Sequence, residues 1–260
     1  MSNIQNKCLI FNARTDTQLA LQLHEVLQSN GQAEVIAVNL QHRQEQELEG
    51  QLTLDVVALA EKLQEVTHVF YLPRIPSWEE KLADLVEADF VSLSNVLNMS
   101  LLNGIKRFTY LSDIEAMGAS LRPMTIDEAS LWSGQTKANE IQKYWYLCEQ
   151  ECTRAGEEGL QIVLLAASCM AKNDLNEREH YYSSSSDLIL KALHYIHLIE
   201  FPLSKIFVVQ EESSSRQMFI NERENFLSKW FGKKKAPVNR LQIDHTKSDA
   251  IIFNENNTLQ

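Results

Sequence analysis

Residues 7–21, KCLIFNARTDTQLAL, carry the strongest fold signal in the chain. The apolar run 8–11 predicts a buried strand, which passes through a short polar turn into the start of a helix. A second apolar run, residues 34–38, follows Gly31 and predicts the next strand. Uninterrupted apolar strands are buried on both faces, as in a parallel sheet with helices on each side. The opening therefore predicts a strand, a helix and a second strand parallel to the first.

The alternation of strand and helix continues along the chain. The remaining predicted elements are helices at 56–64, 78–103, 137–155 and 187–199, the last with Asp187 as its N-cap, and strands at 67–72, 107–111, 160–167 and 206–209. A short amphipathic helix is predicted at 222–231. We predict an α/β fold with a doubly wound parallel sheet, in one Rossmann-like domain at 1–248. Residues 170–248 form its C-terminal region, and 249–260 are expected to be a disordered tail.

Composition excludes several classes of partner. The chain has 260 residues, 35 acidic and 24 basic, and a formal net charge of -11. Such a charge disfavours nucleic acid and anionic membrane surfaces. The first residues are polar, and no apolar run approaches the roughly 20 residues that span a bilayer. We therefore expect a cytoplasmic protein without signal peptide or membrane anchor, which binds neither nucleic acid nor membrane.

The cysteines and histidines do not form a recognised metal motif. Four cysteines are scattered along the chain, which favours reduced thiols over a disulfide framework. Cys148 and Cys152 share one helical face without a matching histidine or cysteine pair. His194 and His197 are three residues apart on a helix and would need a further ligand such as His180. We predict no metal.

The turn after the first strand lacks glycine. In dinucleotide-binding βαβ units, three glycines make the turn, admit the pyrophosphate and let the helix pack closely. Asn12, Thr15 and Gln18 stand at these positions, and Asp16 adds a negative charge at the helix start. Side chains there would fill phosphate space, and the carboxylate would oppose the phosphate charge. We expect no cofactor, the alternative being that NAD(P) still binds through backbone contacts.

Residues 103–118, NGIKRFTYLSDIEAMG, resemble the central strand of the extended short-chain dehydrogenases/reductases, the epimerase and dehydratase group. Residues 125–131, TIDEASL, resemble the loop that follows it. The resemblance implies a Rossmann-like fold, NAD(P), and a serine or threonine after this strand. It also implies a Tyr-x-x-x-Lys pair on the next helix, where the lysine lowers the tyrosine's pKa for proton transfer.

Alignment to this family places other residue types at the chemical positions. Asp113 stands at the serine position, and Ile141 and Trp145 stand at the tyrosine and lysine positions. Asn39 ends the second strand where the family often has an acidic residue for the ribose. A displaced pair, Tyr144 with Lys143, is the alternative catalytic assignment. Isoleucine cannot transfer a proton, so we assign no catalytic residue with confidence from the sequence.

These substitutions favour binding over catalysis. The sequence predicts a catalytically degenerate member of this family that acts as a binding or scaffolding subunit. The expected assembly is a homodimer or heteromer through helices 78–103 and 137–155, with Trp145 and Tyr146 at the contact. A small-molecule ligand in the old substrate cleft is a further possibility. The alternative is an atypical NAD(P)-dependent oxidoreductase or epimerase that uses displaced residues.

Overall fold

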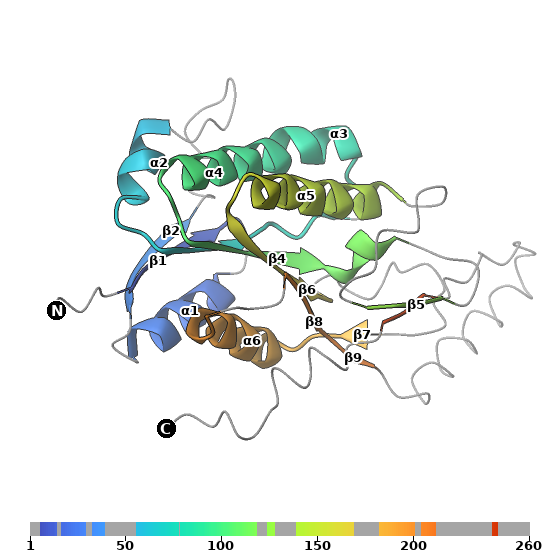
Figure 1. Ribbon diagram of the computed structural model, residues 1–260. Helices are drawn as coiled ribbons and strands as arrows, with labels where there is room; N and C mark the ends of the chain where they lie inside the picture. Colours follow the sequence, from blue (N-terminus) through green and yellow to red (C-terminus); the bar gives the residue numbers. More distant parts are fainter. Residues whose placement is uncertain are drawn as a thin grey trace, which may run out of the picture.

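The protein is built in three layers, with one parallel sheet between two layers of helices (Figure 1). A computed structural model of the chain describes residues 6–14, 17–29, 33–39, 56–77, 79–118, 124–127, 139–168, 182–200, 204–211 and 241–243. The predicted helix 222–231 and the predicted tail 249–260 lie outside these residues. In the described part, no helix has both the length and the apolar character needed to cross a bilayer.

The central sheet has six strands, all parallel, in the order β2-β1-β3-β4-β6-β8. Its strands are β1 (Asn6–Asn12), β2 (Ala33–Asn39), β3 (His68–Leu72), β4 (Arg107–Asp113), β6 (Gln161–Ala167) and β8 (Lys205–Val208). All residues of β3 are buried, as are most of β4 and β6. The predicted doubly wound parallel sheet is therefore confirmed, and β8 is its predicted edge strand.

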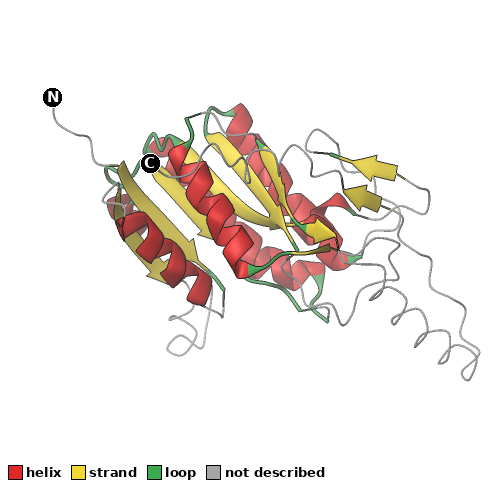
Figure 2. Cartoon of the chain, turned by 90° about the horizontal axis from the view of Figure 1, so that it is seen from below, coloured by secondary structure: helices red, strands yellow, loops and turns green. Residues whose placement is uncertain are grey.

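Helices cover both faces of this sheet (Figures 1 and 2). One layer holds α2 (Val56–Lys62), α3 (Leu82–Leu85), α4 (Val91–Leu102) and α5 (Glu140–Glu157); the other holds α1 (Gln18–Ser29) and α6 (Ser186–Leu198). A π-helical turn (η2, Val86–Phe90) joins α3 to α4. Each layer has its own apolar core, because apolar side chains alternate between the two faces of the strands.

Two short sheets lie beyond the end of the main sheet to which β4 points (Figure 1). β5 (Met124–Ile126) pairs in parallel with β10 (Leu241–Ile243), and β7 (Tyr182–Ser183) pairs antiparallel with β9 (Gln210–Glu211). The sequence did not predict these four strands, because each has only two or three residues and no alternating pattern.

Three helices begin at other residues than predicted, and capping residues explain two of these starts. α5 begins at Glu140 because Asn139 and Gln142 form a reciprocal capping box at its first turn. α6 begins at Ser186, and its N-cap is Ser185, whose hydroxyl accepts a hydrogen bond from the Leu188 amide. The helix predicted from residue 78 begins at Leu82 among the described residues.

Candidate functional site

The chain reverses its direction across the sheet between β1 and β3. From β1 it runs to β2 on one side, then returns to β3 on the other side. In open α/β sheets, ligands bind at such a switch point, outside the carboxyl ends of the strands. Here the amide of Ala13 donates a hydrogen bond to the carbonyl of Leu72 at 2.9 Å, which joins the two strand ends. We call this end of the sheet the carboxyl edge.

The side chain of Asn12 folds inward at this switch point. Its Oδ1 accepts a hydrogen bond from the Arg14 amide at 3.2 Å, and its Nδ2 donates to the Arg14 carbonyl at 3.4 Å. Asn12 is only 3% exposed. This side chain therefore stabilises the turn, and the expectation that it fills phosphate space does not hold.

Other residues of the predicted turn are placed differently. Gln18 is exposed at the first position of α1, while Thr15 and Asp16 lie outside the described residues. Arg14 brings a cation to the switch point, which the sequence prediction did not weigh against Asp16. Asn39 ends β2 and pairs with Asn12 in the sheet register. The turn thus combines a positive charge with the start of a twelve-residue helix.

Asp113, at the family's serine position, is buried and caps a turn. Its Oδ1 accepts a hydrogen bond from the amide of Glu115 at 2.9 Å, which starts the short 3-10 helix η3 (Ile114–Met117). Glu115 in turn accepts a hydrogen bond from Gln142 Nε2 of α5 at 2.8 Å. Together these bonds fix the end of β4 against the first turn of α5.

Ile141 and Trp145 lie in the core beneath the carboxyl edge. They are 2% and 1% exposed, and both belong to the apolar cluster on the α5 face of the sheet. The Trp145 ring packs against Tyr110, with 6.4 Å between ring centroids, and against Tyr144 at 5.4 Å. Since Trp145 is covered by its own chain, it cannot form the predicted subunit contact, whereas Tyr146 is half-buried.

Tyr144 and Lys143 are placed in different environments. Tyr144 is 1% exposed, and burial, with Cys148 next in effect, raises its pKa well above the usual tyrosine value. Lys143 is exposed on α5. A buried tyrosine with a raised pKa holds its proton more firmly, which is the opposite of what the family's lysine does to its tyrosine.

A buried ion pair ties three elements together below this edge. Lys205 Nζ of β8 lies 2.6 Å from Glu149 Oε2 of α5, and Ser112 of β4 donates its hydroxyl proton to Glu149 Oε1 at 2.7 Å. The side chains of Lys205 and Glu149 are 9% and 8% exposed. Sequence reasoning missed this network because nothing in a spacing of 56 residues indicates that the two charges meet.

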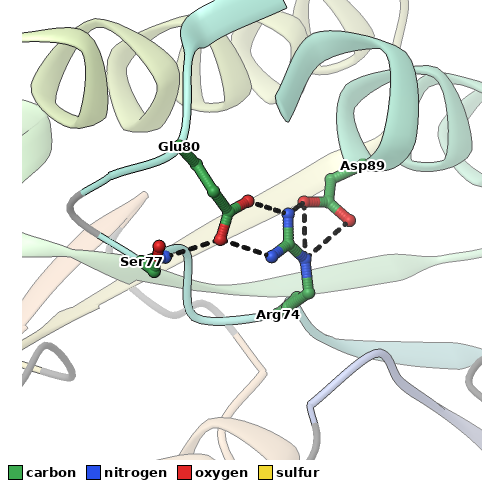
Figure 3. Close-up of polar contacts among 4 residues, drawn as sticks. All are labelled: Arg74, Ser77, Glu80 and Asp89. Carbon is green, nitrogen blue, oxygen red and sulfur yellow. Dashed lines mark hydrogen bonds and ion pairs between the residues drawn. The ribbon is translucent and has the colours of Figure 1, made fainter. Parts of the chain in front are cut away.

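Arg74 follows β3 at the carboxyl edge and is held between two carboxylates (Figure 3). Its two terminal nitrogens donate to the two Glu80 oxygens at 2.9 and 2.7 Å, and it also contacts Asp89 Oδ2 at 2.8 Å. Hydrogen bonding to Arg74 lowers the pKa of Glu80, whereas burial raises that of Asp89. This cluster fixes the segment between β3 and η2.

Comparison with known proteins identifies the fold through similar structures of low sequence identity. No protein-family model and no curated protein matches the sequence. Solved structures match with 10 to 15% identity. UDP-glucuronic acid 4-epimerase from Bacillus cereus in complex with NAD has a TM-score of 0.63 and 15% identity over 95% of this chain and 90% of its own.

Two further structures extend this match. DesIV, a dTDP-glucose 4,6-dehydratase from Streptomyces venezuelae with NAD and TYD bound, has a TM-score of 0.61 and 12% identity over 92% of this chain and 85% of its own. The terminal R domain of the myxalamid biosynthetic pathway has a TM-score of 0.69 and 10% identity over 97% and 86%. The fold is that of the extended short-chain dehydrogenases/reductases.

These matches correct the prediction that the protein uses no cofactor. The epimerase and the dehydratase of this fold were both solved with NAD. The argument for absence rested partly on the Asn12 side chain filling the phosphate space, yet Asn12 folds into its own turn. The absence of glycine therefore does not exclude a dinucleotide.

Proposed function

We propose that this chain binds a nicotinamide dinucleotide at the carboxyl edge and acts as a binding subunit without a tyrosine-lysine proton-transfer pair. One observation carries the proposal: Ile141 and Trp145, at the two proton-transfer positions, are core residues. The NAD-bound structures of the same fold support the dinucleotide. The fold therefore supports the binding of the cofactor, whereas the two core residues support the lack of catalysis.

The start of α1 and Arg14 are the groups that would hold the pyrophosphate. The first amides of a helix lack partners within the helix, and they favour an anion at the positive end of the helix dipole. Arg14 follows β1 directly and adds a guanidinium, which suits phosphate oxygens. Because the Asn12 side chain is folded inward, the pyrophosphate could approach the backbone of the turn.

The residues beside the nicotinamide end cannot replace the family's proton-transfer pair. A general acid must reach the reacting oxygen and give up its proton near neutral pH. Ile141 has no such proton, and the Asp113 carboxylate accepts the hydrogen bond that starts η3. A carboxylate would also repel the negative charge that develops on a reacting oxygen. Hydride exchange with a hydroxyl or carbonyl therefore lacks its acid-base partner.

Titration of NADH and NADPH into the purified protein, followed by calorimetry and by nicotinamide fluorescence, tests the dinucleotide. We expect saturable binding, which Arg14→Glu weakens at least about tenfold because the charge reversal repels phosphate. Lys106→Glu is the matched control, since it makes the same charge change on an exposed residue at the opposite end of β4. No binding by the wild-type chain would contradict the proposal.

Turnover assays test the second part of the proposal. The chain is incubated with NAD and one nucleotide sugar at a time, UDP-glucuronic acid first. Reduced nicotinamide is followed by its absorbance, and sugar epimers are followed in the products. We expect neither to form. A turnover that Asp113→Ala or Tyr144→Phe abolishes would instead support the atypical oxidoreductase or epimerase.

Assembly through α4 and α5 remains part of the proposal. These helices lie side by side on one face of the sheet. Val91 and Leu102 of α4 are 47% and 80% exposed, so both apolar side chains are available for contact with another chain. Light scattering of the wild type and of Leu102→Asp tests this: we expect a larger species that the charge disrupts, whereas a wild-type monomer contradicts it.

A further inference from the structure

Three side chains of metal-ligating type meet at the opposite end of the sheet, which we call the amino edge. Cys8 of β1 and His68 of β3 are paired in the sheet register, and His197 comes from α6. Neighbouring strands lie about 4.8 Å apart, so register partners present their side chains together on one face. The ligand atoms of these three residues all lie within 4.8 Å of one another.

We propose that Cys8, His68 and His197 bind a zinc-class divalent transition metal ion. The Cys8 sulfur lies 3.7 Å from His197 Nδ1. In a tetrahedral zinc centre, with bonds of about 2.3 Å to sulfur and 2.0–2.1 Å to nitrogen, a sulfur and a nitrogen ligand lie roughly 3.6 Å apart. The distance between the Cys8 sulfur and His197 Nδ1 is therefore already close to that of a zinc site. The other two separations between ligand atoms are at most 4.8 Å, so small side-chain adjustments would bring these atoms to bonding distance of one ion.

Thr109 holds the His68 ring in an orientation that suits coordination. The Thr109 hydroxyl lies 2.8 Å from His68 Nε2, and both residues are buried. Metal-binding histidines use one ring nitrogen for the ion and direct the other to a hydrogen-bond partner that fixes the tautomer. In the tautomer in which Nε2–H donates to the Thr109 hydroxyl, the lone pair on Nδ1 is left for the metal. The ring is also stacked on Phe70, with 4.0 Å between ring centroids.

Coordination by these residues requires neutral imidazoles and a thiolate. Cys8 is a buried thiol. When the metal-sulfur bond forms, the thiol proton leaves to solvent and the thiolate offsets one of the two metal charges. The cluster would then carry a single positive charge.

A pocket gives this cluster a route to solvent and a fourth ligand. The cavity has a volume of about 380 Å³ and is lined by residues at the amino ends of β3, β4 and β6 and at the end of α6, His68 and His197 among them. Three protein ligands with a water in the fourth position is the arrangement of zinc sites that remain open. The metal would tie α6 to β1 and β3.

Cobalt substitution tests the site, because Co²⁺ adopts the zinc geometry and is coloured. One equivalent of Co²⁺ added to the reduced, metal-free chain should produce visible d–d bands of tetrahedral intensity and a near-ultraviolet sulfur-to-cobalt band, and Zn²⁺ should abolish both. Cys8→Ser should remove the sulfur band, and His197→Gln should weaken binding by about ten- to a hundredfold or more. Zinc should also raise the melting temperature of the wild type.

Two control variants distinguish the cluster from general binding. His194→Gln changes the neighbouring histidine of α6, and Cys148→Ser changes another buried thiol; neither residue belongs to the cluster. Both should keep the cobalt spectrum, with circular dichroism confirming that every variant is folded. A folded wild type without the sulfur band, or a band that persists in Cys8→Ser, would overturn the proposal. Dinucleotide titrations with and without zinc keep this result separate from that of the proposed function.

Discussion

The two ends of the central sheet use their polar side chains differently. At the carboxyl edge, Asn12, Asp113 and Arg74 are all bound within the fold, to a turn, a helix start and two carboxylates. At the amino edge, Cys8 and His197 face each other at 3.7 Å beside a pocket. The polar groups at the carboxyl edge are thus held by the fold, whereas the amino edge gathers electron-pair donors next to a pocket that His68 and His197 line.

The position at which this fold usually binds its ligand therefore does not show where the ligating side chains of this chain lie. Ile141 and Trp145, which the sequence alignment assigns to the proton-transfer positions, are core residues. Ligating atoms gather instead at the amino edge, the end of the sheet opposite the switch point. Four predictions, in order of decreasing effect, test whether the first edge is structural and the second edge is adapted for binding.

The largest effect is expected from Glu149→Ala, below the carboxyl edge. The change leaves Lys205 buried without its partner, and we expect the free energy of unfolding to fall by about 3–5 kcal/mol. Urea denaturation measures this. The double variant Glu149→Leu with Lys205→Met removes both charges and should recover most of the loss. If the single change costs no more than the double, the ion pair does not fix the three elements.

Thr109→Val tests the amino edge with almost no change of shape. The variant removes the hydroxyl that orients His68, which leaves a buried ring nitrogen without a partner. We expect a loss of about 1–2 kcal/mol in unfolding free energy and a further loss of cobalt affinity. Unchanged cobalt affinity in a stable variant would mean that Thr109 does not orient a ligand.

Glu80→Gln tests the carboxyl edge through pH. Arg74 lowers the pKa of Glu80 in the folded state, so the folded chain binds fewer protons than the unfolded chain as the pH falls through the usual carboxyl range. The stability from this pair is therefore full above that range and lost below it. We expect Glu80→Gln to cost about 1 kcal/mol at neutral pH and nothing in acid, while Glu79→Gln serves as control. A cost independent of pH would contradict this.

The smallest effect is expected from Tyr144→Phe. The ring stays packed against Trp145 and only the hydroxyl is lost, so we expect a change of about 0.5–1 kcal/mol in unfolding free energy and unchanged NADH affinity. Denaturation and the NADH titration measure both. A hundredfold loss of any turnover, the scale of a lost general acid, would instead assign Tyr144 a chemical role.

Continuous apolar runs made the fold predictable, whereas contacts between distant residues limited the prediction of the site. The runs in β1, β3, β4 and β6 predicted a parallel sheet because only burial on both faces suits them. Cys8 and Cys148 are buried, as expected for thiols of the core. Asp113 caps the backbone of η3, because its short carboxylate stands at the end of β4.

Other features depended on topology or backbone direction. Cys8 and His197 are 189 residues apart, and only the docking of α6 beneath β1 and β3 brings them together. The inward fold of Asn12 depends on the backbone of its own turn, which a missing glycine does not reveal. The capping box of α5 was readable in principle, because Asn139 and Gln142 have the spacing of such a motif.

The lysine of β8 also has a consequence for how the last strand is selected. An edge strand of four residues has few contacts of its own to choose among alternative pairings. Sliding β8 by one residue would turn Lys205 to the opposite face, away from Glu149. Its charge would then lie unpaired in an apolar layer. Inward-pointing charge on an edge strand also discourages pairing with strands of other molecules. One buried lysine therefore both selects the correct alignment of the sheet's last strand and guards that strand against aggregation.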